Sequence, residues 1–217
     1  MMNIPSWDNP STKNSGDRLA HGHLGGTTTE GDPDSWFPEL WTWLIEKFDI
    51  ENALDVGCGA GISQKFFHDS GLTTMGLDGY QTGLDCHKLK DVVPTPLVCH
   101  DLLLGPMLFF RPYDLVWTCE VGEHIAPDKV ANFVETVALN CKKVLAFCAA
   151  PPGCGGYHHV NCQAPEYWRE LLEQEGLTYS AEYTEIAHSL TGEGYGRGPR
   201  NYFARSGMIF LGREFEE

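Results

Sequence analysis

The sequence predicts an α/β fold in which seven strands form a doubly wound, mostly parallel sheet with helices on both faces. Three observations support this prediction. Short apolar runs alternate with segments of helical periodicity, a glycine-rich turn directly follows the first run, and acidic residues stand at the ends of successive runs. Alternating strands and helices are typical of parallel sheets, which bind ligands outside the carboxyl ends of their strands.

The chain opens with a polar stretch, residues 1–35, that is rich in Asn, Ser, Gly, Thr and Asp and has no regular periodicity. We expect it to be a flexible terminal segment. Residues 36–48 then place apolar side chains at i, i+3 and i+4, which predicts an amphipathic helix. These side chains are Phe37, Leu40, Trp41, Leu44, Ile45 and Phe48. The length of the chain suits one folded domain, which we expect over residues 36–217.

The first predicted strand, residues 53–56, ends in the turn Gly57-Cys-Gly59-Ala-Gly61. Glycine lets the backbone adopt positive φ and approach a ligand closely, because it has no Cβ. A dinucleotide-binding turn needs G-x-G-x-x-G, but Ile62 occupies its third glycine position. In addition, Asp55 lies two residues before the first glycine. The spacing therefore disfavours a nicotinamide dinucleotide as the ligand.

Acidic residues end the next two apolar runs. Residues 62–70 have helical character with a glycine after them as C-cap, and residues 72–78 form the second predicted strand. Its last residue, Asp78, lies roughly 20 residues past the glycines, where nucleotide-binding folds place a ribose-binding carboxylate. A third apolar run, residues 92–98, leads to Asp101-Leu102.

The second half of the chain continues the alternation. A fourth predicted strand, residues 113–117, opens into Glu120-Val-Gly-Glu123-His124, and Pro127 begins the next helix. The fifth strand, residues 143–148, leads into a loop over residues 151–163. This loop is therefore expected at the carboxyl end of the sheet.

The remaining elements complete the predicted sheet. A helix is expected from Pro165 to Glu175, with a glycine as its stop signal. Two final strands are predicted over residues 179–186 and 208–211.

The ordered motifs resemble those of class I S-adenosylmethionine-dependent methyltransferases from Trp36 onwards. The G-x-G-x-G turn with its preceding acid resembles motif I, and Glu120 to His124 resembles motif IV of the "EVxEH" subtype. The resemblance implies a Rossmann-like seven-stranded domain. It also implies an enzyme that transfers a methyl group from S-adenosylmethionine to an oxygen or nitrogen of a small-molecule acceptor, with S-adenosylhomocysteine as product.

The resemblance also implies a cofactor site. The residues expected there are Asp55, Gly57, Cys58, Gly59, Gly61, Asp78, Gly79, Asp101, Leu102 and Glu120. The glycines would shape the methionine pocket, Asp55 would organise the turn, Asp78 would bind the ribose, and Asp101 with Leu102 would contact adenine. Glu120 would line the pocket floor. For one Asp alone a turn or helix cap is the favoured interpretation, but the order of the three along successive strand ends favours a binding site.

The element His158-His159-Val-Asn161 resembles an "HVN" segment that follows the fifth strand in many small-molecule methyltransferases. His159 is our candidate base, because a neutral imidazole accepts a proton near pH 7. A role in holding the loop by hydrogen bonds is an equal alternative, and positioning alone supplies much of the rate in methyl transfer. Glu123 and His124 are the other catalytic candidates.

A metal site is an alternative that we do not favour. Glu120, Glu123 and His124, with His158 or His159, resemble the magnesium site of small-RNA 3′-terminal 2′-O-methyltransferases and of some quinone-precursor O-methyltransferases. A divalent ion there would lower the pKa of a substrate hydroxyl. A zinc site built from Cys154, His158, His159 and Cys162 is disfavoured by its spacing.

Composition narrows the partners. The formal net charge of −15 disfavours a nucleic acid substrate, because phosphate binding relies on Lys and Arg. Arg197, Arg200 and Arg205 form the one local basic cluster, for which we favour a solvated loop over an anion site. Residues 1–17 are polar and no apolar run would span a bilayer, so we expect neither a signal peptide nor a membrane partner. Eight cysteines without a C-x-x-C pair indicate reduced thiols in the cytoplasm.

Other functions stay open. A metal-assisted 2′-O-methyltransferase of an RNA end is one, although the acidity weighs against it. A NAD(P)-dependent reductase lacks a Tyr-x-x-x-Lys pair as well as the third glycine. A non-catalytic, cofactor-binding methyltransferase-like module is the third. For an active enzyme, acceptor recognition is expected from the N-terminal segment, where related methyltransferases often have a lid, and from the loops at 151–163 and 191–205.

Overall fold

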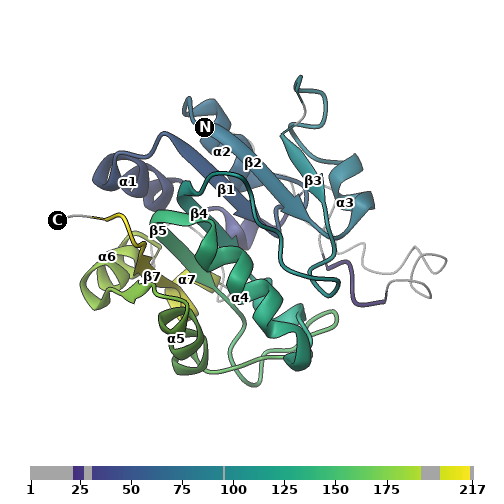
Figure 1. The fold of residues 1–217 in the computed structure, drawn as a ribbon, viewed down its shortest axis with the longest axis vertical. Helices are drawn as coiled ribbons and strands as arrows, with labels where there is room; N and C mark the ends of the chain where they lie inside the picture. The colour runs from purple at the N-terminus through teal and green to yellow at the C-terminus, as the bar shows by residue number, and fades with distance from the viewer. Residues whose placement is uncertain (1–21, 27–30, 95, 192–200, 216–217) are drawn as a thin grey trace.

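A seven-stranded sheet runs through the part of the chain that the structure describes, in the order β3-β2-β1-β4-β5-β7-β6 (Figure 1). The structure is a computed structural model and describes residues 22–26, 31–94, 96–191 and 201–215. The parallel strands are β3 (Leu97–Cys99), β2 (Thr73–Asp78), β1 (Asn52–Val56), β4 (Tyr113–Cys119) and β5 (Cys141–Cys148). Strand β7 (Met208–Leu211) is antiparallel to β5, and β6 (Thr178–Tyr179) is antiparallel to β7. The predicted mostly parallel sheet is confirmed.

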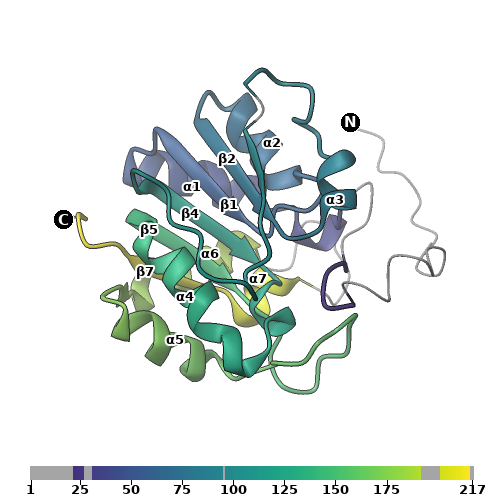
Figure 2. The same ribbon diagram turned by 45° about the vertical axis from the view of Figure 1, so that its right-hand side comes forward.

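Helices cover both faces of this sheet, as Figures 1 and 2 show. On one face α1 (Pro38–Phe48), α2 (Ile62–Asp69), α6 (Ala181–Thr191) and α7 (Tyr202–Ser206) bury aromatic side chains such as Trp41, Phe67 and Phe203. On the other face α4 (Val130–Leu139) and α5 (Pro165–Gln174) bury Phe133 and Trp168. Within the described ranges, the helices are too short or too polar to cross a membrane.

The register of the sheet brings the candidate motifs to one edge. Val56, the last residue of β1, pairs with Leu77 of β2 and with Thr118 of β4. Asp78 at the end of β2, the glycine-rich turn after β1 and Glu120 after β4 therefore lie at neighbouring positions. A short helix after β2, α3 (Gln81–Asp85), was not predicted.

The predicted strand over residues 179–186 is wrong, because β6 ends at Tyr179 and α6 follows directly. The buried residues Tyr183, Thr184 and Ala187 are spaced as on a helix rather than alternating. The hydroxyl of Ser180 accepts a hydrogen bond of 3.2 Å from the amide of Tyr183, which caps the helix start. The β-branched and aromatic residues of this segment favour a strand by composition, but their burial follows the helical period.

The third predicted strand is shorter than expected. Residues 92–94 form a turn in which Val93 is 91% exposed and the Val93–Pro94 peptide is cis, so β3 covers only Leu97–Cys99. Proline has no amide hydrogen to donate to a neighbouring strand, and Pro94 and Pro96 stand inside the predicted run. Smaller differences concern helix starts: α1 begins at Pro38, and the α4 helix begins at Val130 after the 3₁₀ turn Pro127–Lys129.

Candidate functional site

At two positions of the turn after β1, the backbone conformation and the surrounding atoms leave room only for glycine. Gly57 has φ of 77°, and a Cβ added there would lie 2.1 Å from Cγ2 of Val121. Gly61 has φ of 75°, and its added Cβ would lie 2.0 Å from Nε2 of His87. Contacts this short do not occur between real atoms, so a side chain at either position would displace the turn. The turn therefore keeps its backbone open to the space beyond the strands.

The carboxylates of Asp55 and Asp78 lie beside this turn. Asp78 accepts hydrogen bonds from the amide of Gly59 at 2.8 Å and from the amide of Tyr80 at 2.7 Å. Burial raises the pKa of Asp78, and the two amide donors work against that shift. The hydroxyl of Ser63 donates to Asp55 at 2.5 Å, while burial raises the pKa of Asp55 to about 7. Both acids are thus held in fixed orientations by neighbouring donors.

A cavity of about 600 Å³ opens beyond the strand ends, a size typical of small-molecule sites. All the residues expected to bind the cofactor line it, namely Asp55, Gly57, Cys58, Gly59, Gly61, Asp78, Gly79, Asp101, Leu102 and Glu120. The imidazoles of His124 and His159 line the same cavity. The residues singled out in the sequence therefore meet around one space, although they come from four strand ends and a loop.

One end of the cavity is formed by Asp101 and its surroundings. Oδ1 of Asp101 accepts a hydrogen bond of 2.9 Å from the amide of Leu103, and Oδ2 accepts one of 2.7 Å from Nε2 of His23. The carbonyl of Leu102 is held by Nδ2 of Asn132 at 2.7 Å. Sequence reasoning did not single out His23 as a site residue. Its place within an H-G-H-L-G-G stretch was the available signal.

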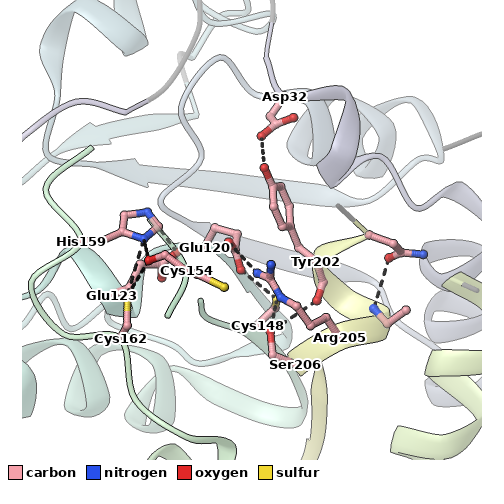
Figure 3. Close-up of polar contacts among 12 residues, drawn as sticks. Asp32, Glu120, Glu123, Cys148, Cys154, His159, Cys162, Tyr202, Arg205 and Ser206 are labelled. Atoms are coloured by element: carbon pink, nitrogen blue, oxygen red, sulfur yellow. Dashed lines mark hydrogen bonds and ion pairs between the residues drawn. The ribbon is translucent and has the colours of Figure 1, made fainter. Parts of the chain in front are cut away.

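Glu120 lies toward the opposite end of the cavity, where Tyr202 and Arg205 of α7 also line the wall (Figure 3). Its Oε1 accepts a hydrogen bond of 3.3 Å from Sγ of Cys148, and its Oε2 lies 3.4 Å from Nη2 of Arg205. Burial raises the pKa of Glu120, while Cys148 and Arg205 lower it. The hydroxyl of Tyr202 donates to Asp32 at 3.0 Å. Helix α7 and the residues before α1 therefore close this end of the cavity together.

The solvated loop that we favoured for the basic cluster is wrong for Arg205. This residue lies on α7, pairs with Glu120 and faces the cavity. Arg197 and Arg200, together with most of the loop at 191–205, lie outside the described residues, as do residues 1–21 and 27–30 of the N-terminal segment.

A buried carboxylate and two imidazoles form a cluster beside the cavity. Glu123 is fully buried, and neither of its carboxylate oxygens has a hydrogen-bonding partner of normal geometry among the described residues. The rings of His124 and His159 meet edge to face at 4.9 Å, and Nε2 of His159 lies 4.0 Å from Oε1 of Glu123. One donor atom from each residue lies within 4.8 Å of the other two, so the three side chains form a set that fits a metal ion.

Burial shifts the protonation of this cluster. It raises the pKa of Glu123 to about 8, and the charge of Glu120 adds to the shift, whereas the amides of Glu123 and Ala150 lower it. Burial also lowers the pKa of His124 to about 4, with further contributions from His159 and His158. His124 is therefore neutral near pH 7, and burial favours the protonated form of Glu123 far more than in an ordinary glutamate.

The backbone explains why His159, not His158, joins this cluster. The amides of Val160 and Asn161 both donate to the carbonyl of Glu123, at 2.9 and 3.0 Å, and so dock the loop on the motif. His158 has φ of 49°, and its ring lies 6.4 Å from that of His23. In the structure His159 therefore lies next to Glu123 and His124, whereas Glu120 accepts from Cys148 and pairs with Arg205.

Nδ1 of His159 lies 3.3 Å from the carbonyl oxygen of Cys154 and 3.6 Å from Sγ of Cys162 (Figure 3). Because a carbonyl only accepts, the contact with Cys154 favours the tautomer that carries its hydrogen on Nδ1. In the neutral ring Nε2 then has a free lone pair, and this atom faces the cluster side at Glu123.

Comparisons with known proteins establish the fold class. No protein-family model and no curated protein sequence matches this chain. A sugar N-methyltransferase from Streptoalloteichus has a similar structure, with a TM-score of 0.62 and 13% identity over 99% of both chains. The magnesium protoporphyrin IX methyltransferase of Synechocystis, solved with bound S-adenosylmethionine, gives a TM-score of 0.55 and 17% identity over 82% of this chain and 79% of that one.

A third similar structure is a TehB-like S-adenosylmethionine-dependent methyltransferase from Corynebacterium glutamicum. Its TM-score is 0.53, with 18% identity over 84% of this chain and 89% of that one. At such low identities the likeness concerns the fold. This chain therefore has the Rossmann-like fold found in class I methyltransferases, as its strand order also indicates.

Proposed function

We propose that this protein is an S-adenosylmethionine-dependent methyltransferase that acts on an oxygen or nitrogen of a small-molecule acceptor. The observation that carries the proposal is the shared cavity in which the glycine-rich turn, the strand-end carboxylates and the imidazole of His159 meet. A cavity at the carboxyl ends of parallel strands is where such folds bind their ligands. The fold alone hosts many activities, so the argument rests on these side chains.

The residues along the cavity fit an adenosyl cofactor. Asp78 is oriented by two amides and keeps lone pairs that suit the ribose hydroxyls, while Asp101 suits the adenine amino group. The glycine turn leaves room for the methionine portion, and Asp55 and Glu120 border it with acidic groups that complement its positive charges. When bound, S-adenosylmethionine supplies a methyl group activated by a sulfonium and leaves as S-adenosylhomocysteine.

His159 is the proposed base. Its Nε2 lone pair suits the proton that an acceptor O–H or N–H loses as it becomes methylated. A proton on His159 would in turn favour ionisation of Glu123, because opposite charges 4.0 Å apart stabilise each other. His124 lines the same wall and, uncharged at neutral pH, adds no competing positive charge.

Charge and cysteine chemistry support a small acceptor in the cytoplasm. The formal charge of −15 disfavours phosphate-rich substrates. Two proteins of similar fold are a sugar N-methyltransferase and a magnesium protoporphyrin IX methyltransferase, both of which act on small molecules. All eight cysteines are free, as in a reducing compartment. We propose residues 36–217 as the methyltransferase domain and residues 1–35 as a flexible segment before it, of which the described residues 23–26 line the cavity.

A metal-assisted reaction is the second candidate, and the position of the buried Glu123 carboxyl next to the imidazoles of His124 and His159 favours it. Glu123, His124 and His159 would hold a divalent ion, which would lower the pKa of an acceptor hydroxyl, as in a 2′-O-methyltransferase of an RNA end. Glu120, the fourth donor of that pattern, is directed to Cys148 and Arg205 instead. For this reason we place the metal-free reaction first.

Calorimetric titration tests the proposal. The purified protein is titrated with S-adenosylmethionine, S-adenosylhomocysteine and NADH, each with and without magnesium. We expect the adenosyl ligands to bind and NADH not to bind, with little effect of magnesium. A folded protein that binds neither adenosyl ligand would overturn the proposal and move a reductase ahead. Binding without turnover on any acceptor would favour a non-catalytic module, and a strong magnesium effect would favour the metal-assisted candidate.

A further inference from the structure

We infer that residues 22–26, here called the N-terminal strap, build the outer wall of the adenine subsite. In this wall His23 is a positioning residue for Asp101, and Leu24 provides apolar surface over Gly79. The inference rests on the proposed function, because it assigns the occupant of this end of the cavity as the adenosyl group. The inference assigns to the cofactor site residues 22–26, which lie outside the motifs at the strand ends.

The first step is the contact between His23 and Asp101. Nε2 of His23 lies 2.7 Å from Oδ2 of Asp101, and both side chains are largely shielded, at 25% and 16% exposure. The amide of Leu103 holds the other carboxylate oxygen at 2.9 Å. Asp101 is therefore fixed from two sides, and each of its oxygens keeps a lone pair for a further donor. An adenine amino group is a donor of the required kind.

The second step is the packing of Leu24 on Gly79. A Cβ added to Gly79 would lie 2.7 Å from Cδ2 of Leu24, so the leucine side chain rests directly on bare backbone. Gly79 follows the ribose-binding candidate Asp78 and offers no apolar surface of its own. An aromatic base binds best against apolar faces, and Leu24 lines the cavity at this point. The strap thus supplies the apolar surface that the strand end lacks.

The third step connects the strap to the loop that holds His159. The hydroxyl of Tyr157 donates to the carbonyl of Gly22 at 3.1 Å, and a Cβ on Gly25 would lie 3.2 Å from the Tyr157 ring. Gly26 lies in the same way beside His124, because a Cβ added to it would lie 3.3 Å from Cε1 of that ring. The strap therefore joins the adenine end of the cavity to the catalytic side.

A purely structural strap would behave differently from a positioning one. Loss of a structural contact lowers the melting temperature and need not distinguish parts of the ligand. Loss of the adenine wall weakens adenosine and S-adenosylhomocysteine by the same factor, because the two ligands share that end. This difference defines the experiment.

The test compares His23→Ala and Leu24→Ala with the wild-type protein. Dissociation constants for adenosine and S-adenosylhomocysteine are measured by calorimetry, together with melting temperatures. We expect each variant to bind both ligands about tenfold more weakly, the size of one lost hydrogen bond or apolar contact. His23→Gln, which keeps a donor, should recover most of the affinity. His68→Ala, in an exposed position on α2, and Leu104→Ala, at 82% exposure, are the matched controls and should bind as wild type.

The outcomes separate this inference from the proposed function. If the wild-type protein binds S-adenosylhomocysteine and both strap variants bind the two ligands equally well, the strap inference is wrong and the proposed function stands. If Ala and Gln at position 23 weaken binding equally, the positioning role of the His23 donor is wrong. If the folded wild-type protein binds neither ligand, the proposed function itself fails.

Discussion

The amide of Gly59 donates a 2.8 Å hydrogen bond to Oδ2 of Asp78, and this contact joins the turn after β1 to the end of β2. The two motifs are separate in the sequence but act as one unit in the structure. A change at Asp78 therefore affects both the ribose contact and the position of the turn.

Asp78→Asn should weaken S-adenosylhomocysteine binding by about 10- to 100-fold. The substitution keeps the shape of the side chain but removes a charge, and hydrogen bonds to a charged acceptor are about twice as strong as neutral ones. Calorimetry on the folded variant measures the effect. Asp69→Asn, on the exposed end of α2, is the control and should bind as wild type. Equal affinity in the Asp78 variant would exclude its carboxylate from the cofactor site.

Gly57→Ala should abolish cofactor binding and destabilise the protein by more than about 2 kcal/mol. Positive φ alone costs an alanine about 1–2 kcal/mol, and the contact with Val121 adds to this. Gly71→Ala separates the two effects, because Gly71 also has positive φ, at 90°, but open space around it. Urea denaturation should show about 1–2 kcal/mol for Gly71→Ala, with normal ligand binding. Similar losses in both variants would contradict the steric role of Gly57.

His159→Ala should lower kcat by about 10²- to 10⁴-fold, the usual contribution of a positioned base. Cofactor affinity should stay near the wild-type value, because the His159 ring lies next to Glu123 and not at the adenine end of the cavity. Turnover is measured as S-adenosylhomocysteine released with an acceptor found in a panel of small alcohols and amines. His158→Ala should retain turnover. A reversed result would assign the base to His158.

Glu123 should make the wild-type protein less stable as the pH rises. Its pKa is about 8 in the folded protein against 4.5 for an ordinary glutamate, so the folded state binds more protons than the unfolded state between these values. This contribution to the free energy of unfolding is complete below about pH 4.5 and is lost as the pH rises through about 8. Glu123→Gln should reduce the slope of stability against pH, with the contribution of Asp55 remaining, whereas Glu166→Gln, at an exposed position, should leave the slope unchanged. Chemical denaturation between pH 5 and 9 checks it, and unchanged slopes in Glu123→Gln would contradict the raised pKa.

The strand ends could be predicted from the sequence because each signal there is local. The apolar runs of β1, β2, β4 and β5 are continuous in the sequence, and the acids belong to these strands: Asp55 is the last residue but one of β1, and Asp78 is the last residue of β2. These features depend on periodicity and on the residues beside them, and the structure confirms them. The cofactor roles of these acids stay predictions.

The remaining site residues line the cavity because of tertiary contacts, which cannot be predicted from the neighbouring residues in the sequence. His23 comes from a polar segment, and Arg205 and Tyr202 come from a short helix within a predicted loop. Their partners, Asp101, Glu120 and Asp32, lie far from them in the sequence. The error over residues 179–186 has a related origin, because strand propensity was outweighed by helical packing of Tyr183 and Ala187 on the sheet.

The contact between Tyr202 and Asp32 has a consequence for how the molecule forms. The two residues are 170 positions apart in the sequence, so this end of the cavity closes only when α7 has left the ribosome. Contacts of such long range are made late, because the loop between them must be ordered first. A chain that ended after β5 would contain the glycine turn and Asp78 but not Tyr202, whose hydroxyl joins α7 to Asp32 at this wall. Cofactor binding is therefore expected to begin only at the last stage of folding.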